Sequence, residues 1–456
     1  ARHFANNGFK VNVVFLYDEN KMSDDCKTNF NILKKLSRDN ANILIKKFGS
    51  VKDLRFVVDN DIIFDAMLGS GAKGSLREPY NTIVEYINKS KAFKVAIDIP
   101  TGLDADRGYA DLSFVSDLTV TLGEFKAGLF FGDGAALCGE VIKGNIGVDY
   151  FYFAKFETIR YLIEPEDAVN NLPFKKKNIH KYTSGKVLTI AGSGLFPGAA
   201  SMTSKSALRV GAGASILCFP KSIRKLIYTN IPEVVINAYD DKGSEILREY
   251  NTKELSERLQ WADVLAIGPG LGRAKDTVEA VRKIIKEHKF KNIIIDADAL
   301  FALKEKQYKN FNLENFVLTP HYGEFANLIG IEIEKLKKDI LGYGNSFAQE
   351  TNSYLILKGA PTIIFTPAGD ALINTTGNPG MAKFGSGDVL TGVTAGFLSQ
   401  GKDVEKAVIL GVYIHSLAAD LLLKDFTEFG FTSIDIMNNL PKAIKFLRGT
   451  FDQHFN

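Results

Sequence analysis

Short runs of β-branched and other apolar residues recur along the whole chain, with amphipathic segments of helical periodicity between many of them. In the first third the expected strands are Val11–Leu16, Ile62–Leu68, Val95–Ile99 and Leu118–Leu122. Segments with helical periodicity, Asn29–Leu36 and Tyr80–Ile87, lie between some of them. This alternation is typical of α/β folds that are built on a mostly parallel sheet.

A second series of strands follows in the rest of the chain. The expected strands are Lys186–Ala191, Ala214–Phe219, Val264–Ile267, Ile293–Ile295, Phe316–Leu318 and Tyr354–Leu357. Nearly every one ends in glycine or in a polar cluster: AGSG, GPGLG, DAD, TPHYGEF or KGAPT. Ligands of open α/β sheets bind outside the carboxyl ends of the strands, so we expect these clusters to line one crevice.

The length of 456 residues exceeds what a single hydrophobic core usually serves, and it predicts two domains. The periodicity breaks between Phe156 and Asn178, where the chain reads IEPEDAVNNLPFKKKN, and we expect the linker there. The predicted domains are residues 1–160 and residues 165–456.

Composition narrows the class of partner and the compartment. Hydrophobic residues make up 45% and charged residues 24% of the chain, and the net charge is only +3. This balance argues against nucleic acid or an anionic membrane as a partner, and no apolar run reaches the ~20 residues of a membrane span. Three scattered cysteines, Cys26, Cys138 and Cys218, predict neither a disulfide framework nor a zinc site. We therefore expect a soluble cytoplasmic protein.

The stretch NTTGNPGMAKFGSGDVLTG, residues 374–392, is dense in glycine and ends in an apolar segment that predicts a buried helix. Unpaired N–H groups and the positive end of the helix dipole would lie at Gly385–Gly387, an arrangement suited to phosphate oxygens. Asp388 has two interpretations. It is either a helix cap worth about 1 kcal/mol, or a base that takes a proton from a hydroxyl attacking phosphorus.

Polar residues at other strand ends are also open to two interpretations. Lys358 either approaches phosphate or is simply exposed, and His321 is either structural or part of the site. Asp296 and Asp298 leave their strand at alternate positions, so we expect one to face the crevice and the other to cap the next helix. Close approach of the backbone to a ligand is suggested by Gly268, Gly270 and Gly272.

A glycine-rich loop also occurs in the first domain. Residues 69–74, GSGAKG, follow an expected strand and match the pattern G-x-G-x-x-G, which alone is not specific for dinucleotides. Asp65 ends the strand before this loop, and Asp98 lies in IDIPTG, where Pro100 and Gly102 force a sharp turn. The two acids either converge on one crevice or face solvent separately.

The motifs of the second domain, taken together and in order, resemble a known family. HKYTSGKVLTIAGS, GSGLFPGAAS, GPGLG, DADAL, LTPHYGEF, LKGAPT and GNPGMAKFGSGDVLTG, between about residues 165 and 445, look like the ADP- or ATP-dependent NAD(P)H-hydrate dehydratase of the ribokinase-like superfamily. The resemblance implies a ribokinase-like α/β domain and an adenine nucleotide, ADP or ATP, accompanied by Mg²⁺. Nothing in the sequence chooses between ADP and ATP.

The resemblance also implies site residues. Nucleotide binding falls on Lys358, Gly359, Ala360, Pro361 and Thr362, and on Asn378, Pro379, Gly380, Met381, Ala382, Lys383, Phe384, Gly385, Ser386 and Gly387. Substrate binding falls on Ala199, Gly270, His321 and Asp388. In the implied chemistry Asp388 activates the C6 hydroxyl of the hydrate, the hydroxyl receives a phosphoryl group, and loss of phosphate restores the dihydronicotinamide. Lys383, Phe384 and Tyr322 depart from the family, which usually has small residues at the first two positions and proline at the third.

The first domain resembles the NAD(P)H-hydrate epimerase domain, a Rossmann-like three-layer α/β/α unit that is fused ahead of the dehydratase in bacterial repair enzymes. The matching stretches are FDAMLGSGAKG, AIDIPTGLDAD and TLGEFKAGLFFGDG. By this resemblance Asp98 is the catalytic acid and also contacts substrate, and Asp65 and Thr101 are ligands of K⁺, although serine is commoner at the last position. The loop contacting substrate comprises Gly69, Ser70, Gly71, Ala72, Lys73, Gly74 and Ser75.

The family's asparagine- and glycine-rich substrate loop would immediately precede the segment ARHFANNG with which the sequence starts. We expect epimerisation to depend on that loop.

The sequence as a whole predicts a bifunctional, homo-oligomeric repair enzyme. Its first domain would interconvert the C6 epimers of NADHX and NADPHX, the hydrates of NADH and NADPH, and its second would dehydrate the S epimer. Two alternatives stay open at this point. One is a ribokinase-like kinase for a vitamin or sugar with a non-catalytic nucleotide-binding N-terminal domain, and the other is a first domain that only scaffolds oligomers.

Overall fold

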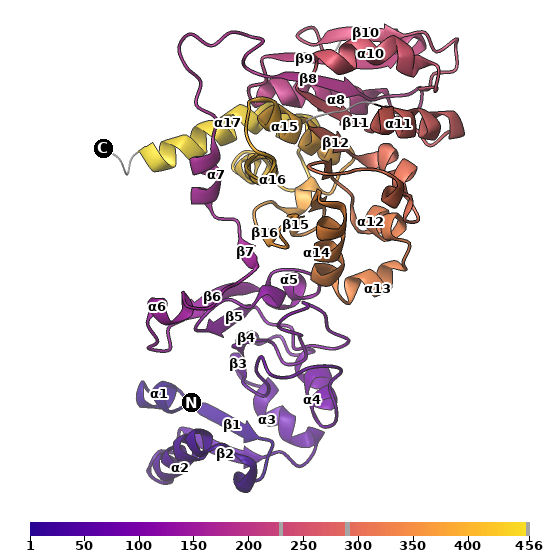
Figure 1. Cartoon of the computed structure of the whole chain (residues 1–456). Helices are drawn as coiled ribbons and strands as arrows, with labels where there is room; N and C mark the ends of the chain where they lie inside the picture. Colours follow the sequence, from indigo (N-terminus) through magenta and orange to yellow (C-terminus); the bar gives the residue numbers. More distant parts are fainter. Residues whose placement is uncertain (228–230, 288–291, 453–456) are drawn as a thin grey trace. The chain divides into compact units, whose positions relative to one another are not determined.

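The computed structural model describes residues 1–227, 231–287 and 292–452. The chain forms two compact α/β units, Ala1–Glu157 and Thr158–Asn456 (Figure 1). None of the helices in the described ranges combines the length and hydropathy that crossing a bilayer requires.

The first unit contains a two-stranded and a four-stranded parallel sheet. Their strands are β1 (Val11–Phe15) and β2 (Ile43–Lys47), then β3 (Ile62–Asp65), β4 (Phe93–Ile97), β5 (Leu118–Leu122) and β6 (Glu140–Gly144), paired in that order. The helices are α1 (Arg2–Asn6), α2 (Asp24–Asp39), α3 (Arg55–Val58), α4 (Tyr80–Ile87), α5 (Gly134–Leu137) and α6 (Tyr150–Phe153).

The two faces of the four-stranded sheet differ. One face buries Ile63 and Ala96 in a core with Ile83 and Val84 of α4. The opposite face leaves apolar side chains exposed at Ile62, Phe64, Phe93, Leu122 and Ile142. Parallel sheets are usually covered on both faces, and a contiguous apolar patch is typical of an interaction surface.

The second unit contains a ten-stranded sheet. Its spatial order is β10-β9-β8-β11-β12-β13-β14-β15-β16-β7, parallel from β10 to β14 and antiparallel on both sides of β15. The strands are β7 (Arg160–Leu162), β8 (Lys186–Ile190), β9 (Ala214–Pro220), β10 (Val235–Tyr239), β11 (Val264–Ile267), β12 (Ile293–Ile295), β13 (Val317–Leu318), β14 (Tyr354–Leu357), β15 (Thr362–Phe365) and β16 (Ala371–Asn374). From β8 the strand numbers rise towards one edge of the sheet, and from β11 they rise towards the other, so the direction of winding reverses between β8 and β11. Such a switch point opens a crevice at the carboxyl ends of the strands.

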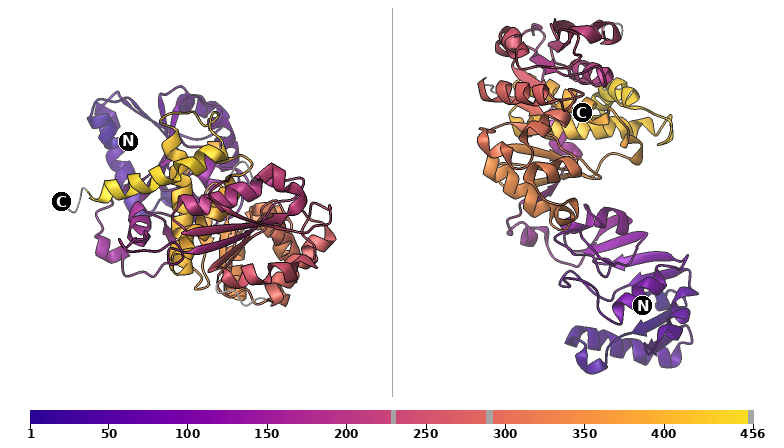
Figure 2. Two further views of the ribbon diagram at one scale, coloured as in Figure 1. Left: turned by 90° about the horizontal axis from the view of Figure 1, so that it is seen from above. Right: turned by 90° about the vertical axis from the view of Figure 1, so that its right-hand side faces the viewer.

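Helices cover both faces of this sheet (Figure 2). They are α7 (Pro165–Asn171), α8 (Pro197–Arg209), α9 (Arg224–Ile227), α10 (Asn251–Trp261), α11 (Lys275–Glu287), α12 (Tyr322–Ile329), α13 (Ile333–Lys337), α14 (Ile340–Thr351), α15 (Ser386–Ser399), α16 (Val404–Leu422) and α17 (Ser433–Asp452). Helix α15 is almost wholly buried, and the main core cluster draws on it and on α16 and α17.

The expected α/β organisation is confirmed, and the strands expected from the apolar runs are present within a few residues of their expected ends. The strands predicted from the sequence did not include β2, β6, β7, β10, β15 and β16. Part of the expected linker is ordered structure of the second unit, because β7 pairs with β16 and α7 packs on α16. The polar composition of that segment is explained by its place at the edge of the sheet.

Glycine decides how closely α15 approaches its neighbours. A Cβ at Gly392 would lie 2.1 Å from the Thr203 carbonyl oxygen of α8, and a Cβ at Gly396 would lie 2.4 Å from a methyl of Val210. Helix α16 meets α15 in the same way, since a Cβ at Gly411 would lie 2.5 Å from Thr394 Oγ1. The position of the α15 N-terminus therefore depends on close packing at Gly392 and Gly396, which lie more than one turn further along the helix.

We expect Gly392→Ala to destabilise the second unit by about 1–3 kcal/mol, the usual cost of overpacking. The control is Gly449→Ala in α17, where a Cβ meets nothing within 4 Å. That change should be neutral or stabilising by up to about 1 kcal/mol. Trp261 is the only tryptophan of the sequence and lies in α10, so urea unfolding followed by its fluorescence reports this unit. Equal unfolding midpoints for the two variants would contradict the packing argument.

Candidate active site

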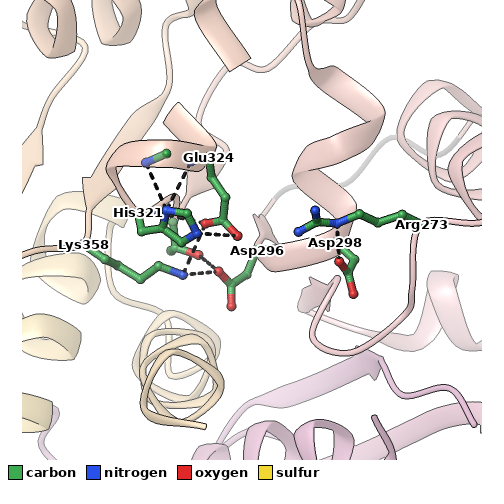
Figure 3. A network of polar contacts seen from close by, with 8 residues as sticks. Arg273, Asp296, Asp298, His321, Glu324 and Lys358 are labelled. Atoms are coloured by element: carbon green, nitrogen blue, oxygen red, sulfur yellow. Dashed lines mark hydrogen bonds and ion pairs between the residues drawn. The ribbon is translucent and has the colours of Figure 1, made fainter. Parts of the chain in front are cut away.

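The polar clusters of the second unit meet at the carboxyl ends of its central strands. Figure 3 shows Asp296 after β12, His321 after β13 and Lys358 after β14 as one network, with Asp298 and Arg273 beside it. A backbone bridge pairs His321 with Lys358, and the Lys358 N–H donates to the Pro320 carbonyl at 2.8 Å. The expectation that these strand ends line one site is thus met by their geometry.

Asp296 is the buried centre of this network. Its side chain is only 1% exposed and its carboxylate accepts hydrogen bonds from three other side chains. Oδ1 accepts from the Thr319 hydroxyl and from Lys358 Nζ, each at 2.7 Å, and Oδ2 accepts from the Thr391 hydroxyl at 2.7 Å. The carboxylate therefore joins β12, β13, β14 and α15.

Asp298 turns away from Asp296, as alternate positions leaving a strand predict. Its Oδ2 accepts from the Gly272 N–H at 2.9 Å, and its Oδ1 forms an ion pair with Arg273 Nε at 2.8 Å. The expectation that the acid turned away from the crevice caps the following helix was wrong, because Asp298 lies inside that helical segment and the cap position belongs to Asp296. It occupies the residue before the 3₁₀ segment Ala297–Leu303 without a side-chain cap bond.

The ammonium group of Lys358 lies close to the start of α15. A Cβ at Gly387 would lie 3.4 Å from Lys358 Nζ. Burial alone would lower the pKa of this lysine, but the carboxylates of Asp296 and Glu324 outweigh burial and raise it. Lys358 is thus a stable cation beside the glycine turn, which is what an anion-binding site requires.

Asp388 is not a helix cap. The cap position of α15 belongs to Gly385, whose φ of 90° is left-handed and favours glycine, and Asp388 lies in the first turn of the helix. Burial raises the pKa of Asp388 to about 7, with a further rise from Asp296, an opposing effect of Lys358 and a smaller rise from Asp298. A half-buried carboxyl group with a pKa near neutrality has the proton affinity of a general base.

His321 has a structural role. Its Nδ1 accepts from the Gly323 and Glu324 N–H groups at 3.1 and 3.2 Å, while the Glu324 carboxylate accepts from the His321 N–H at 2.9 Å. This capping box starts α12 and fixes the ring so that Nε2 lies 3.5 Å from Glu324 Oε1. Tyr322 packs on the next strand end, where a Cβ at Gly359 would lie 2.7 Å from its ring.

The expected substrate residues Ala199 and Gly270 are neighbours. Gly270 has a φ of 65°, and a Cβ there would lie 2.6 Å from the Phe196 carbonyl oxygen and 3.0 Å from the Ala199 Cβ. Further along α8, Met202 reaches Gly385, where a Cβ would lie 2.6 Å from the Met202 methyl. Helix α8 therefore connects the pair Ala199 and Gly270 to the loop that precedes α15.

The loop 378–387 is tied down at both ends. At its start, the Asn378 amide donates to Asp420 Oδ1 at 2.9 Å, and Asn378 Oδ1 accepts from the Gly380 N–H at 3.0 Å. At its end, Ser386 Oγ lies 3.4 Å from Nε2 of the buried His415. Burial lowers the pKa of His415 to about 4, so this histidine is neutral at pH 7.

Lys383 has a clear structural explanation. Its ammonium group donates to the carbonyls of Glu428, Phe429 and Phe431, and it lies 5.0 Å from the centre of the Phe431 ring. The same ring fills the space next to Gly380, where a Cβ would lie 2.3 Å away. Lys383 therefore fastens the loop to residues 428–431. The neighbouring Phe384 is fully exposed, and nothing in the structure explains its ring.

Mg²⁺ is the metal ion that the family resemblance implies for this site. No cluster of three or more acidic, histidine or cysteine side chains with metal-binding geometry occurs among the residues described. Mg²⁺ commonly keeps several waters and binds through phosphates with few protein carboxylates. The residues are therefore compatible with an ion that arrives with the nucleotide.

In the first unit Asp65 and Thr101 lie together and are buried. Asp65 Oδ2 accepts from the Thr101 N–H at 2.7 Å, and Oδ1 accepts from the Thr101 hydroxyl at 2.8 Å and from the Met67 N–H at 3.1 Å. Burial raises the pKa of Asp65, and this effect outweighs the hydrogen bonds, which lower it. These donors hold the Asp65 carboxylate against Thr101, and the K⁺ ligands stay a prediction.

Asp98 has a left-handed backbone, with a φ of 71°. Its Oδ1 lies 2.5 Å from Lys126 Nζ and 3.2 Å from the Leu122 nitrogen. Burial favours the neutral acid, but Lys126 and the Leu122 N–H outweigh it and lower the pKa of Asp98. Such a strained backbone at a charged residue is typical of functional sites.

The loop Gly69–Ser75 adjoins Asp98, because a Cβ at Gly69 would lie 3.6 Å from Asp98 Oδ2. Further along the loop, Lys73 pairs with Asp106 at 3.5 Å and Ser75 Oγ donates to Asp111 at 2.5 Å. Asp98 therefore adjoins the start of the predicted substrate loop, and its partner Lys126 was not identified from the sequence.

Several site residues were missed in the second unit as well. Thr319, Thr391 and His415 lie in apolar segments, where single polar residues gave no signal. Their positions became meaningful only when the partners Asp296 and Ser386 were located.

Comparison with known proteins agrees with this geometry. Residues 187–442 match the family model for NAD(P)H-hydrate dehydratase, and residues 1–128 match the model for the YjeF-related protein N-terminus. The bifunctional NAD(P)H-hydrate repair enzyme Nnr of Thermofilum pendens is 34% identical over 99% of this chain and 85% of its own length. The Escherichia coli enzyme of the same name is 32% identical over 84% of this chain and 72% of its own.

A solved structure is similar to the second unit. The ADP/ATP-dependent NAD(P)H-hydrate dehydratase from Bacillus subtilis, co-crystallised with ATP/Mg²⁺, is 28% identical with a TM-score of 0.54. The match covers 63% of this chain and 98% of that chain. Strand-end chemistry, two family models and relatives that match nearly end to end converge, and the chain belongs to the family of bifunctional NAD(P)H-hydrate repair enzymes.

Proposed function

We propose that the second unit dehydrates the S epimer of NADHX or NADPHX at the expense of ADP or ATP. The single observation that carries this proposal is Asp388, a half-buried carboxyl group with a pKa of about 7 beside a glycine turn and the cation Lys358. Family membership and the similar ATP/Mg²⁺ structure support the nucleotide. Mg²⁺ would neutralise charge on the phosphates.

In the proposed reaction Asp388 accepts the proton of the C6 hydroxyl as its oxygen forms a bond to the terminal phosphorus of the nucleotide. The bond between that phosphorus and the bridging oxygen breaks, and the shortened nucleotide leaves. The phosphate ester at C6 is then eliminated together with the C5 proton, which restores the C5=C6 double bond. We propose that the N–H groups of Gly385 and Gly387 and the Lys358 ammonium hold the phosphoryl oxygens. The Ser386 N–H donates to the Lys383 carbonyl at 3.3 Å.

The nucleotide is proposed to bind to two segments that the fold brings together. Lys358–Thr362 forms the turn between β14 and β15, and Asn378–Gly387 leads into α15. They meet where Lys358 Nζ approaches Gly387. Ala199, Gly270 and Nε2 of His321 are the proposed contacts of the hydrate.

We propose that the first unit epimerises the hydrates, with Asp98 as the acting carboxylate and Gly69–Ser75 as the substrate loop. The support is the ion pair of Asp98 with Lys126 next to that loop. Self-association is a further proposal, supported by the exposed apolar face of the four-stranded sheet. The cytoplasmic location and the K⁺ ion stay predictions from the sequence.

The central test follows dihydronicotinamide absorbance and phosphate release with the S hydrate and either ADP or ATP. We expect both signals to appear together in the parent chain. Accumulation of a phosphorylated hydrate without recovery of absorbance would contradict a dehydratase and favour a kinase.

We expect Asp388→Asn to lower kcat by about 10²–10⁴-fold, the usual contribution of a general base. Nucleotide affinity, measured by calorimetry, should stay within a few fold because the backbone N–H groups are retained. In the parent, kcat/KM should rise with pH through about 7, since the base must lose its proton. A variant that turns over within a few fold of the parent would remove Asp388 from the chemistry.

We expect Lys383→Met to raise the nucleotide KM by about tenfold while kcat stays within a few fold. Hydrogen bonds of a charged donor are worth about 1.5–3 kcal/mol, and 1.4 kcal/mol corresponds to a factor of ten. Lys383→Arg should recover most of the affinity. Lys424→Met is the control, because Lys424 lies over the Phe446 ring at 5.2 Å outside this loop. An unchanged KM in Lys383→Met would show that the anchor does not order the nucleotide site.

Epimerisation is tested with a mixture of the R and S hydrates and excess nucleotide. We expect a parent chain that includes the predicted asparagine- and glycine-rich loop to recover the whole mixture, and Asp98→Asn in that chain to stop when the S fraction is consumed. The rate with pure S hydrate should be unchanged in Asp98→Asn. If recovery by the parent also stops at the S fraction, epimerisation is not a property of residues 1–157.

A further inference from the structure

The buried carboxylate of Asp296 has no assigned part in the chemistry, yet it holds the cation closest to the proposed base. Lys358 Nζ donates to Asp296 Oδ1 at 2.7 Å, whereas its distance to Glu324 Oε2 is 3.9 Å. Lys358 also interacts electrostatically with Asp388. Two carboxylates, Asp296 and Asp388, therefore compete for one ammonium group.

The competition has a direct chemical consequence. A carboxylate that pairs closely with lysine is held in its charged form, and its pKa falls by about 1–3 units. A base with such a low proton affinity removes a hydroxyl proton poorly, because general-base efficiency falls with basicity. If Lys358 paired with Asp388, the cation needed for the phosphoryl group would weaken the base needed for the hydroxyl.

The surroundings of Asp296 decide the competition. The hydroxyls of Thr319 and Thr391 hold the carboxylate from two sides, one on each oxygen, each at 2.7 Å. The carboxylate therefore has little freedom to turn, and its Oδ1 stays directed at Lys358. Burial in this position makes the ion pair costly to break, since an unpaired buried charge is unfavourable.

We propose that Asp296 is a positioning residue, a fixed counter-ion that keeps Lys358 directed at the phosphate site and away from Asp388, so that Asp388 remains basic. This inference rests on the proposed dehydratase function. It divides the roles of two acids that carry the same functional group: Asp296 holds Lys358, and Asp388 exchanges a proton.

Three charged groups act on Asp388, and they come from two strand ends and a short helical segment. Asp296 comes from the end of β12, Asp298 from the 3₁₀ segment that follows, and Lys358 from the end of β14. On the far side of Lys358 lies Glu324 of α12, and behind Ser386 lies His415 of α16, which is neutral at pH 7. Loss of the Asp296 charge therefore acts on Asp388 in one direction, directly and through the release of Lys358.

The test is the pH profile of kcat/KM for the S hydrate in Asp296→Asn. We expect the acid limb to move to lower pH by about one unit and the plateau to fall about tenfold, because the base is weaker. A variant that is merely damaged in structure would lose plateau rate without moving the limb. An unmoved limb in a folded Asp296→Asn would overturn the proposal.

Two matched variants sharpen the result. Lys358→Met removes the positive charge and should move the limb to higher pH, opposite to Asp296→Asn. Asp298→Asn removes a charge that is engaged with Arg273 and Gly272, and it should move the limb less than Asp296→Asn does. Equal shifts for Asp296→Asn and Asp298→Asn would reduce the effect to general electrostatics and overturn the positioning role.

A direct measurement covers two further cases. The Asp388 carboxyl carbon is titrated by NMR without substrate or nucleotide, with Asp388→Asn identifying its signal. If Asp296→Asn does not fold, the double variant Asp296→Asn with Lys358→Met replaces the ion pair by neutral groups and is compared with Lys358→Met alone. Because Lys358 is absent from both, a pKa of Asp388 that is little changed in the double variant supports a role of Asp296 through Lys358. A pKa lower by about one unit, the whole shift expected for Asp296→Asn, would show a direct charge effect and overturns the positioning role.

The NMR titration separates the proposed role of Asp296 from the proposed dehydratase function. Absence of dehydration by the parent chain would reject the proposed function, while the NMR titration would still report whether Asp296 controls the proton affinity of Asp388.

Discussion

Four elements of the second unit are joined at one buried carboxylate. Asp296 follows β12 and accepts hydrogen bonds from Thr319 after β13, Lys358 after β14 and Thr391 within α15. A buried charge is tolerated only when it is paired and fully hydrogen-bonded, so these elements must take their observed places together. The start of α15, with its glycine turn and Asp388, is positioned by this requirement on one side and by glycine packing against α8 on the other.

This arrangement allows one site to hold an anion and a base. Phosphate needs positive charge and free N–H groups, whereas a base needs surroundings that make its negative charge unfavourable. Burial and the nearby Asp296 raise the pKa of Asp388 to about 7 while Lys358 stays charged a short distance away. The two neighbouring carboxylates thus have different surroundings, since Asp296 is paired with Lys358 and Asp388 has a raised pKa, and their proposed roles rest on this difference.

The polar and glycine-rich strand ends identified the glycine loop, Lys358, Asp388 and Gly270 as candidates, because strand-end positions converge in any open α/β sheet. The resemblance of the motifs to a known family added Ala199. The interpretation of Asp388 as a helix cap was wrong, since α15 begins at Ser386 and its cap position is Gly385, three residues before Asp388. His321, by contrast, caps a different helix, α12, in a capping box with Glu324. Strands β15 and β16 were missed, and only the structure shows that they add antiparallel pairing to the parallel strands.

The sequence by itself determined the α/β class, the two-part organisation and the chemical types at each strand end, because these follow from local periodicity and from glycine. Only the tertiary structure decided which charges meet. Asp296 and Lys358 are 62 residues apart and Asp296 and Thr391 are 95 apart, and no local pattern relates them. The proton affinity of Asp388 arises from burial and from neighbours distant in sequence, so it became definite only when the strands and α15 packed together.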